Sequence, residues 1–172
     1  MNTHYRPKSM AALLSLVLAL LLAGGNRAAA QTVTHSSDEQ HLHQLLKTYV
    51  KAVDTLDLRL VARIWSHDPG VSFIQPRGTE NGFEQIRDDF YIKTMGVFSQ
   101  RDLTMENPVF HVYGDTAWSQ MTWTFHATLK EGGQKITTTG RETQIYRKEN
   151  GVWRIVHDHY SGPPVTGARK GF

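Results

Sequence analysis

The sequence GRETQIYRKENGVWRIVHDHYSG, residues 140–162, carries the clearest structural signal in this chain. Polar residues alternate with apolar or aromatic ones on both sides of Glu149-Asn150-Gly151, a composition typical of a tight turn between two antiparallel strands. We therefore predict strands at about 136–147 and 152–160. The C-terminal side of the chain should be an antiparallel sheet.

Upstream, the sequence first repeats this pattern and then changes period. Two more strand-like runs, at about 103–112 and 117–129, are separated by glycine-containing turns. Before residue 102 the apolar spacing is helical and predicts helices at 37–56, 57–65 and 83–95, with one short strand at 71–74. Helices first and strands afterwards indicate an α+β domain over residues 37–162, in which the concave face of one antiparallel meander packs on a helical layer.

The two faces of the predicted strand 117–129 differ in character. One face is apolar and contains Met121, Trp123 and Phe125, whereas the other mixes aromatic and polar groups and contains Trp118 and Thr124. A mixed face is suited to line a semi-polar cavity beneath the helices, and an apolar face is suited to bury against another subunit. Alternation alone does not determine which face points where.

The first thirty residues are typical of a secretory signal peptide. A basic start, an apolar run at 10–25 and the small residues Ala28-Ala29-Ala30 predict cleavage after Ala30, with an uncleaved anchor as the alternative. Residues 31–36 are predicted to be a flexible leader and residues 163–172 a loose tail. The mature protein would then be periplasmic or secreted, without a membrane anchor.

Composition excludes several functional classes. The chain has no cysteine, which rules out disulfides, thiol chemistry and a lipoprotein anchor. Its formal net charge of +3 comes from three basic residues in the predicted signal peptide, so the mature part is neutral. The remaining basic residues are interleaved with acids, and we therefore expect no nucleic-acid partner.

Two short motifs in the last strands are candidates for chemistry. His157-Asp158-His159 contains metal-ligating residue types, but alternation directs Asp158 away from the two histidines, so we predict structural histidines, no metal and no cofactor. Arg141 and Glu142 are neighbours in a strand and must point to opposite faces. One of them should face a cavity or an interface.

Residues 140–162 also resemble a known family. They are similar to the final hairpin of the calcium/calmodulin-dependent protein kinase II association domain and of its bacterial SnoaL-like relatives, in the pattern E-T-x-[VI]-aromatic followed by G-x-W-x-[VI]-V-H-x-H-x-S-G. Asn107-Pro108, Gly114-Asp115 and Gly132-Gly133 fall at that family's landmarks. The resemblance implies the nuclear-transport-factor-two-like fold, a cone-shaped half-barrel with a strongly curved sheet wrapped on about three helices, a deep pocket, and dimers that can build rings.

The resemblance also implies which positions line the pocket. The pocket arginines of the association domain fall on Thr124, Gln144 and Tyr160, so its carboxylate-binding site is not carried over. The general base of ketosteroid isomerases falls on Gln75, whose amide cannot accept a proton at neutral pH. Tyr49 falls near their oxyanion-hole tyrosine, although its place in an apolar stripe also fits a core residue.

These observations predict an exported module that binds a small apolar or semi-polar molecule, or assembles with itself as a homodimer or larger ring, without catalysis. The alternative is a SnoaL-like isomerase, cyclase or hydrolyase acting on a hydrophobic carbonyl compound. Its acid–base candidates are His159, Asp158 and Glu142. The predicted ligand-contacting residues are Tyr49, Trp65, Thr124, Glu142, Gln144 and Tyr160.

Overall fold

The computed structural model describes residues 37–162. The predicted signal peptide, the cleavage site after Ala30, the leader at 31–36 and the tail at 163–172 lie outside these residues. The elements are α1 (Ser37–Thr55), α2 (Leu58–Ile64), β1 (Ser72–Gln75), β2 (Gly78–Asn81), α3 (Phe83–Gln85), the π-helix η1 (Ile86–Thr94), the 3₁₀-helix η2 (Met95–Val97), β3 (Phe98–Tyr113), β4 (Thr116–Leu129), β5 (Lys135–Glu149) and β6 (Val152–Ser161).

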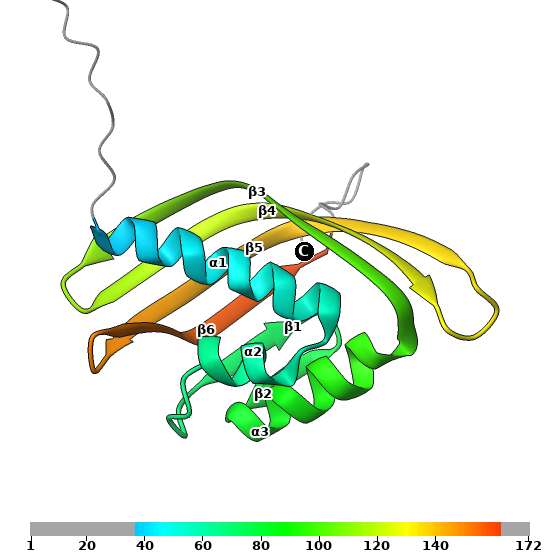
Figure 1. The fold of residues 1–172 in the computed structure, drawn as a ribbon, viewed down its shortest axis with the longest axis horizontal. Coiled ribbons are helices and arrows are strands. Elements are labelled where there is room, and N and C mark those ends of the chain that lie inside the picture. The colour runs from blue at the N-terminus through cyan, green and yellow to red at the C-terminus, as the bar shows by residue number, and fades with distance from the viewer. Residues whose placement is uncertain (1–36, 163–172) are drawn as a thin grey trace, which may run out of the picture. The chain divides into compact units, whose positions relative to one another are not determined.

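The strands form one six-stranded sheet in the order β2-β1-β6-β5-β4-β3. β3 to β6 are a continuous antiparallel meander, β1 joins β6 in parallel, and β2 closes a short hairpin with β1. Figure 1 shows the long strands bending around α1, with the other helices below it. The predicted α+β fold, a curved, mainly antiparallel and unclosed sheet packed on N-terminal helices, is confirmed.

The strand β2 was not predicted. The sequence Gly78-Thr79-Glu80-Asn81 has no apolar alternation, and only Glu80 is buried. Its pairing comes from the hairpin with β1, in which Gln75 lies opposite Gly78. Hydrogen bonding of the backbone therefore makes a strand where side-chain pattern indicates a loop.

The first two helices follow the predicted signals. The apolar stripe of α1 is buried, including Leu42, Leu46 and Tyr49. Asp57 caps α2, and its carboxylate accepts a hydrogen bond from the Arg59 backbone N–H at 2.9 Å. This cap satisfies one of the free N–H groups that open a helix.

The third predicted helix, at 83–95, exists but is wound mostly as a π-helix. The Met95 N–H donates to the carbonyl of Phe90, and Thr94 Oγ1 donates to the Asp89 carbonyl at 2.8 Å, both across five residues. The wider turn brings Phe90, Thr94 and Met95 to one side, where all three line the same cavity. Such π-turns are often found at functional sites.

A β-bulge in β6 changes which of its side chains share a face. Ile145 pairs with His157 and Tyr146 pairs with Ile155, so Val156 is an extra residue in β6. After this residue the alternation shifts by one position. Asp158 is therefore buried on the same concave face as Trp153 and Ile155, although simple alternation from those residues predicts the opposite.

The concave face of the sheet also differs from the two-sided picture drawn from alternation. Met121, Trp123 and Phe125 of β4 are buried on the same face as Glu142 and Gln144 of β5. The apolar face of β4 therefore packs within the chain, and it is not free to cover another subunit. Apolar and polar groups of neighbouring strands meet beneath the helices.

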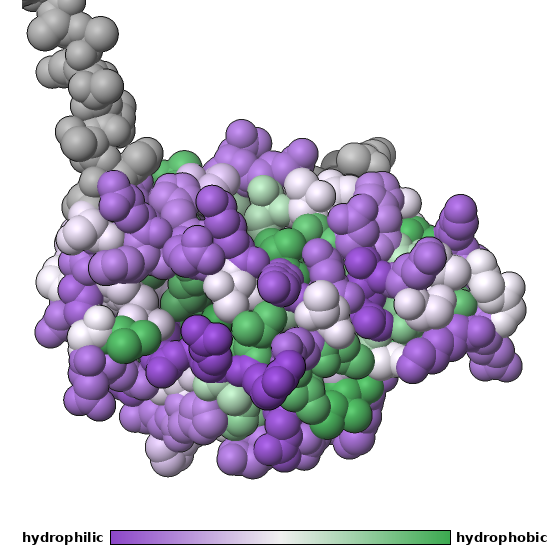
Figure 2. Space-filling model, viewed as in Figure 1, coloured by the Kyte–Doolittle hydropathy of each residue, from purple (hydrophilic) through white to green (hydrophobic). Residues whose placement is uncertain are grey.

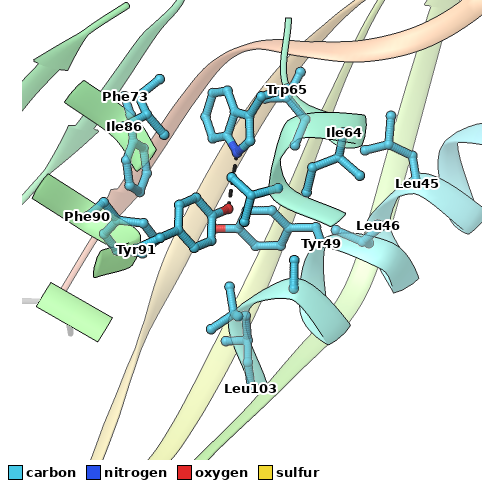
Figure 3. Close-up of a cluster of buried hydrophobic side chains, with 14 of the residues drawn as sticks. Leu45, Leu46, Tyr49, Ile64, Trp65, Phe73, Ile86, Phe90, Tyr91 and Leu103 are labelled. Carbon is cyan, nitrogen blue, oxygen red and sulfur yellow. Dashed lines mark hydrogen bonds between the residues drawn. The ribbon is translucent and has the colours of Figure 1, made fainter. Parts of the chain in front are cut away.

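The core between α1, α2 and η1 contains a buried aromatic contact. The Trp65 indole N–H donates to the Tyr91 hydroxyl at 3.0 Å, and Tyr49 lies beside this pair (Figure 3). Both partners are fully buried. Buried tryptophan and tyrosine usually satisfy their polar ends in this way.

Candidate functional site

A cavity of about 270 Å³ lies between the concave face of the sheet and the helices. Six of its eighteen lining residues are aromatic. The rings come from α1, η1, β3, β4 and β6, namely Tyr49, Phe90, Phe98, Trp123, Phe125 and Tyr160. Trp123 and Tyr160 meet edge to face at 5.5 Å between ring centroids, and Phe98 and Phe125 do so at the same distance. These contacts hold the wall in place.

Few charged groups interrupt this wall. Among the described residues that line the cavity, Arg77 and Glu142 are the charged ones. Arg77 is exposed, whereas Glu142 has only 4% of its surface exposed. Gln75 also lines the cavity and accepts a hydrogen bond from the Tyr160 hydroxyl at 3.0 Å. The cavity thus has one buried ionisable carboxyl among apolar walls.

The Glu142 carboxyl belongs to a fully buried polar network. The Gln144 side-chain amide donates to Glu142 Oε1 at 2.6 Å and to Asp158 Oδ2 at 3.3 Å. The Tyr146 hydroxyl donates to Gln144 Oε1 at 2.7 Å. The Ser119 hydroxyl is hydrogen bonded to the same Tyr146 hydroxyl at 2.8 Å. One glutamine therefore holds two carboxyl groups side by side, with Glu142 the member that reaches the cavity.

Burial changes how these two carboxyls ionise. Burial raises the pKa of Glu142 to about 7, against the opposing effect of its hydrogen bonds from Gln144, Asp158 and Tyr49. The pKa of Asp158 is raised well above its ordinary value, first by burial and then by the neighbouring Glu142 charge. Two neighbouring buried carboxyls do not both ionise readily, because their negative charges repel each other. The pair therefore carries at most one negative charge near neutral pH.

The pair has no basic counterpart in the part of the chain that the structure describes. Within residues 37–162, no lysine, arginine or histidine forms a hydrogen bond or ion pair with Glu142 or Asp158. Asp158 Oδ1 accepts no hydrogen bond from any donor in the same part of the chain. Buried carboxylates are normally paired with a cation or a full set of donors.

Residues 34–159 match the family model of the SnoaL-like domain. The chain belongs to the SnoaL-like domain family. A nuclear transport factor 2 (NTF2-like) superfamily protein from Salmonella enterica is 42% identical, with a TM-score of 0.74 over 77% of this chain and 96% of that chain. Its coverage shows that the same fold makes up nearly all of that protein.

The chain is also similar to the association domain in structure and in sequence. A protein from Xanthomonas campestris assigned as a calcium/calmodulin dependent protein kinase II association domain has a TM-score of 0.65 and 20% identity, over 76% of this chain and 91% of that one. Calcium/calmodulin-dependent protein kinase type II from Caenorhabditis elegans is 24% identical over 131 residues, 76% of this chain and 18% of the kinase. The chain spans between 18% and 26% of the length of the curated kinases that it matches.

The SnoaL-like domain brings some predicted site residues together. Tyr49, Glu142 and Tyr160 line the cavity. Gln144 and Asp158 are fully buried beneath Glu142 and hold it in place. The bulge in β6 is the reason that Asp158 reaches this group.

The structure places three other predicted residues elsewhere. Trp65 is fully buried and does not line the cavity, because its indole is committed to Tyr91. Thr124 lies on the convex face, since it alternates with the cavity-facing Trp123. His159 is exposed on that same convex face, directly beyond the buried Asp158, and it cannot reach the cavity.

Several cavity residues were not predicted from the sequence. Phe90, Phe98 and Trp123 have the spacing of ordinary core residues, and nothing in their local pattern distinguishes a cavity wall from a packed core. Gln75 lines the cavity as a neutral residue. The one sequence signal that could have placed Gln75 in the cavity is its position, which corresponds to the general base of ketosteroid isomerases.

Two further findings concern the described part of the chain. Residues 37–162 contain no cluster of three or more histidine, aspartate or glutamate side chains arranged to hold a metal ion. None of their helices combines the length and the apolar composition needed to cross a bilayer.

Proposed function

We propose that this SnoaL-like domain binds a small, predominantly apolar molecule in the cavity, with one polar group of that molecule at Glu142. The observation that supports this most directly is a buried carboxyl within an aromatic wall. Ligand sites of proteins are typically apolar pockets with a few placed polar groups. The volume of about 270 Å³ suits a molecule of one or two rings.

A fluorescence or calorimetric titration with 4-phenylbutan-1-ol, which has one ring and one hydroxyl, tests this proposal. We expect saturable binding by the wild-type domain. Thr138 is exposed and lines the cavity, so Thr138→Trp should fill it and weaken binding by about tenfold or more. Thr137→Trp is the matched control, because Thr137 is exposed and bonds His126 at 2.9 Å, away from the cavity. Equal loss in both variants, or no binding by the wild type, would contradict the proposal.

A second candidate function is acid–base catalysis by Glu142. The observation that favours it is the pKa of about 7, which suits a group that both takes and returns a proton near neutral pH. Glu142 would remove a proton next to the carbonyl of an apolar ketone, and the resulting enolate would recover a proton from the same carboxyl. Of the three candidates named from the sequence, only Glu142 lines the cavity.

Proton exchange detects this chemistry without knowledge of the natural substrate. In D₂O the wild-type domain should speed the exchange of the α-protons of 4-phenylbutan-2-one, followed by proton NMR. Glu142→Gln should return the exchange rate to that of buffer, because an amide cannot accept the proton. His159→Ala should have no effect, since His159 lies on the exposed convex face. Exchange that depends on His159 and not on Glu142 would exclude this assignment.

We further propose that the mature chain is exported and self-associates. The apolar N-terminal run with its Ala28-Ala29-Ala30 site supports export. Similarity to an association domain supports a dimer or larger ring. Mass spectrometry of the secreted chain and light scattering at micromolar concentration test the two parts, and a monomer would contradict the second.

A further inference from the structure

We infer that the ligand of this cavity is an apolar molecule that carries a protonated amine, held by the Glu142 carboxylate and the surrounding aromatic rings. This inference rests on the proposed binding function and specifies the chemistry of its ligand.

The groups that surround Glu142 favour a ligand of positive charge. The groups whose pKa responds to the Glu142 charge are all acids or phenols: Tyr49 of α1, Tyr91 of η1, Tyr146 of β5, and Asp158 and Tyr160 of β6. Glu80 raises and Arg77 lowers the pKa of Tyr160. The cation that lines the cavity, Arg77, is exposed and makes no ion pair with Glu142 among the described residues. A buried negative group without a protein cation is complementary to a positive ligand.

Aromatic rings in the cavity wall also favour a cation. Rings of Phe90, Trp123, Phe125 and Tyr160 line the cavity together with Glu142. The negative faces of aromatic rings attract ammonium groups, most strongly where water is excluded. Aliphatic walls would bind the apolar part of a ligand equally well, but they would offer nothing to its charge. Aromatic rings with one carboxylate are the combination that recognises an organic ammonium ion.

The charge of the Glu142–Asp158 pair fits a ligand with a single positive group. Because two neighbouring buried carboxyls do not both ionise readily, the pair presents at most one negative charge near neutral pH, which matches one ammonium group. Burial raises the pKa of Glu142 because it removes the charged form from water, and the hydrogen bonds to the carboxylate offset this only in part. An ammonium ion beside it would stabilise the charged form and lower this pKa. The carboxylate and the amine would then form a charge-assisted hydrogen bond, which is stronger than a bond between neutral groups.

Three probes of equal length separate this inference from the proposed function. These are 4-phenylbutylamine, 4-phenylbutan-1-ol and 4-phenylbutyrate, titrated against the full domain at pH 8. We expect the amine to bind about tenfold tighter than the alcohol, and the butyrate to bind weakest. Glu142→Gln should bring the amine and the alcohol to similar affinities, whereas Arg77→Gln should preserve the preference for the amine.

A measurement on the wild-type protein gives an independent test. The amine stays protonated between pH 8 and pH 5, whereas Glu142 gains a proton in this range because its pKa is about 7. Amine affinity should therefore fall towards pH 5, and alcohol affinity should change little. Equal binding of amine and alcohol, lost in Thr138→Trp, would overturn the inference and leave the binding function standing. Tightest binding of the butyrate would also overturn it, and no binding of any probe would overturn both.

Discussion

Replacing Gly140 with alanine is expected to destabilise the domain by about 3 kcal/mol or more, a large part of the roughly 5–15 kcal/mol that stabilises a typical domain. A Cβ at this position would lie 1.9 Å from the backbone oxygen of Ser161 and 2.6 Å from the Trp123 ring. The first contact involves the main chain of β6, which cannot rotate away like a side chain. Relief requires that the end of β6 separate from β5, where Arg141 pairs with Ser161.

Urea unfolding followed by circular dichroism measures this effect. Gly96→Ala is the matched control, because a Cβ at Gly96 meets nothing within 4 Å. It should leave the unfolding free energy unchanged or slightly higher, since alanine favours helical structure over glycine. Similar stabilities for the two variants would show that the β5–β6 pair tolerates the extra methyl group. The cavity wall would also be affected, because Trp123 packs over Gly140.

Glu142→Gln is expected to stabilise the domain at alkaline pH while removing a charge from its site. The pKa of Glu142 rises from its ordinary 4.5 to about 7 on folding, so the folded state binds the proton more tightly. This stabilisation is complete below pH 4.5 and is lost as pH rises through 7. A shift of this size corresponds to about 3 kcal/mol. Glutamine is neutral at every pH, so the variant does not lose stability as the pH rises through 7.

The difference between the unfolding free energies of Glu142→Gln and the wild type isolates this group. Between pH 4.5 and pH 8, the unfolding free energy of the variant should rise by about 3 kcal/mol relative to that of the wild type. The contributions of the other titrating groups cancel in this difference. Glu106→Gln, at an exposed position of β3, should show no such trend. A pH-independent difference for Glu142→Gln would mean that its charged form is already satisfied in the folded protein.

The surface around the helix at 83–97 shows why exposure alone does not locate the site. Figure 2 shows mostly hydrophilic residues on this face of the molecule, with apolar ones gathered near that helix. Ile92 and Val97 are each 45% exposed. The cavity is instead formed by residues of eight elements that are mostly buried, and only the assembled fold brings them together.

The sequence by itself determined the architecture. Period-two alternation in residues 140–162 and the Glu149-Asn150-Gly151 turn specify the β5–β6 hairpin, because a strand exposes alternate side chains and a short turn requires particular residues. The helical stripe of α1 and the cap at Asp57 are equally local. Family resemblance then added the curvature of the sheet, which no single segment encodes.

The site depended on tertiary structure. The parity of β6 changes at Val156, and this bulge decides that Asp158, and not His159, lies beneath the helices. A bulge forms where it lets two whole strands pair and pack, so alternation along β6 alone cannot reveal it. Likewise, the raised pKa of Glu142 comes from burial by α1, η1 and the sheet together. The sequence determined the strands that carry the acidic pair, whereas packing determined which carboxyl meets the cavity and in what state of charge.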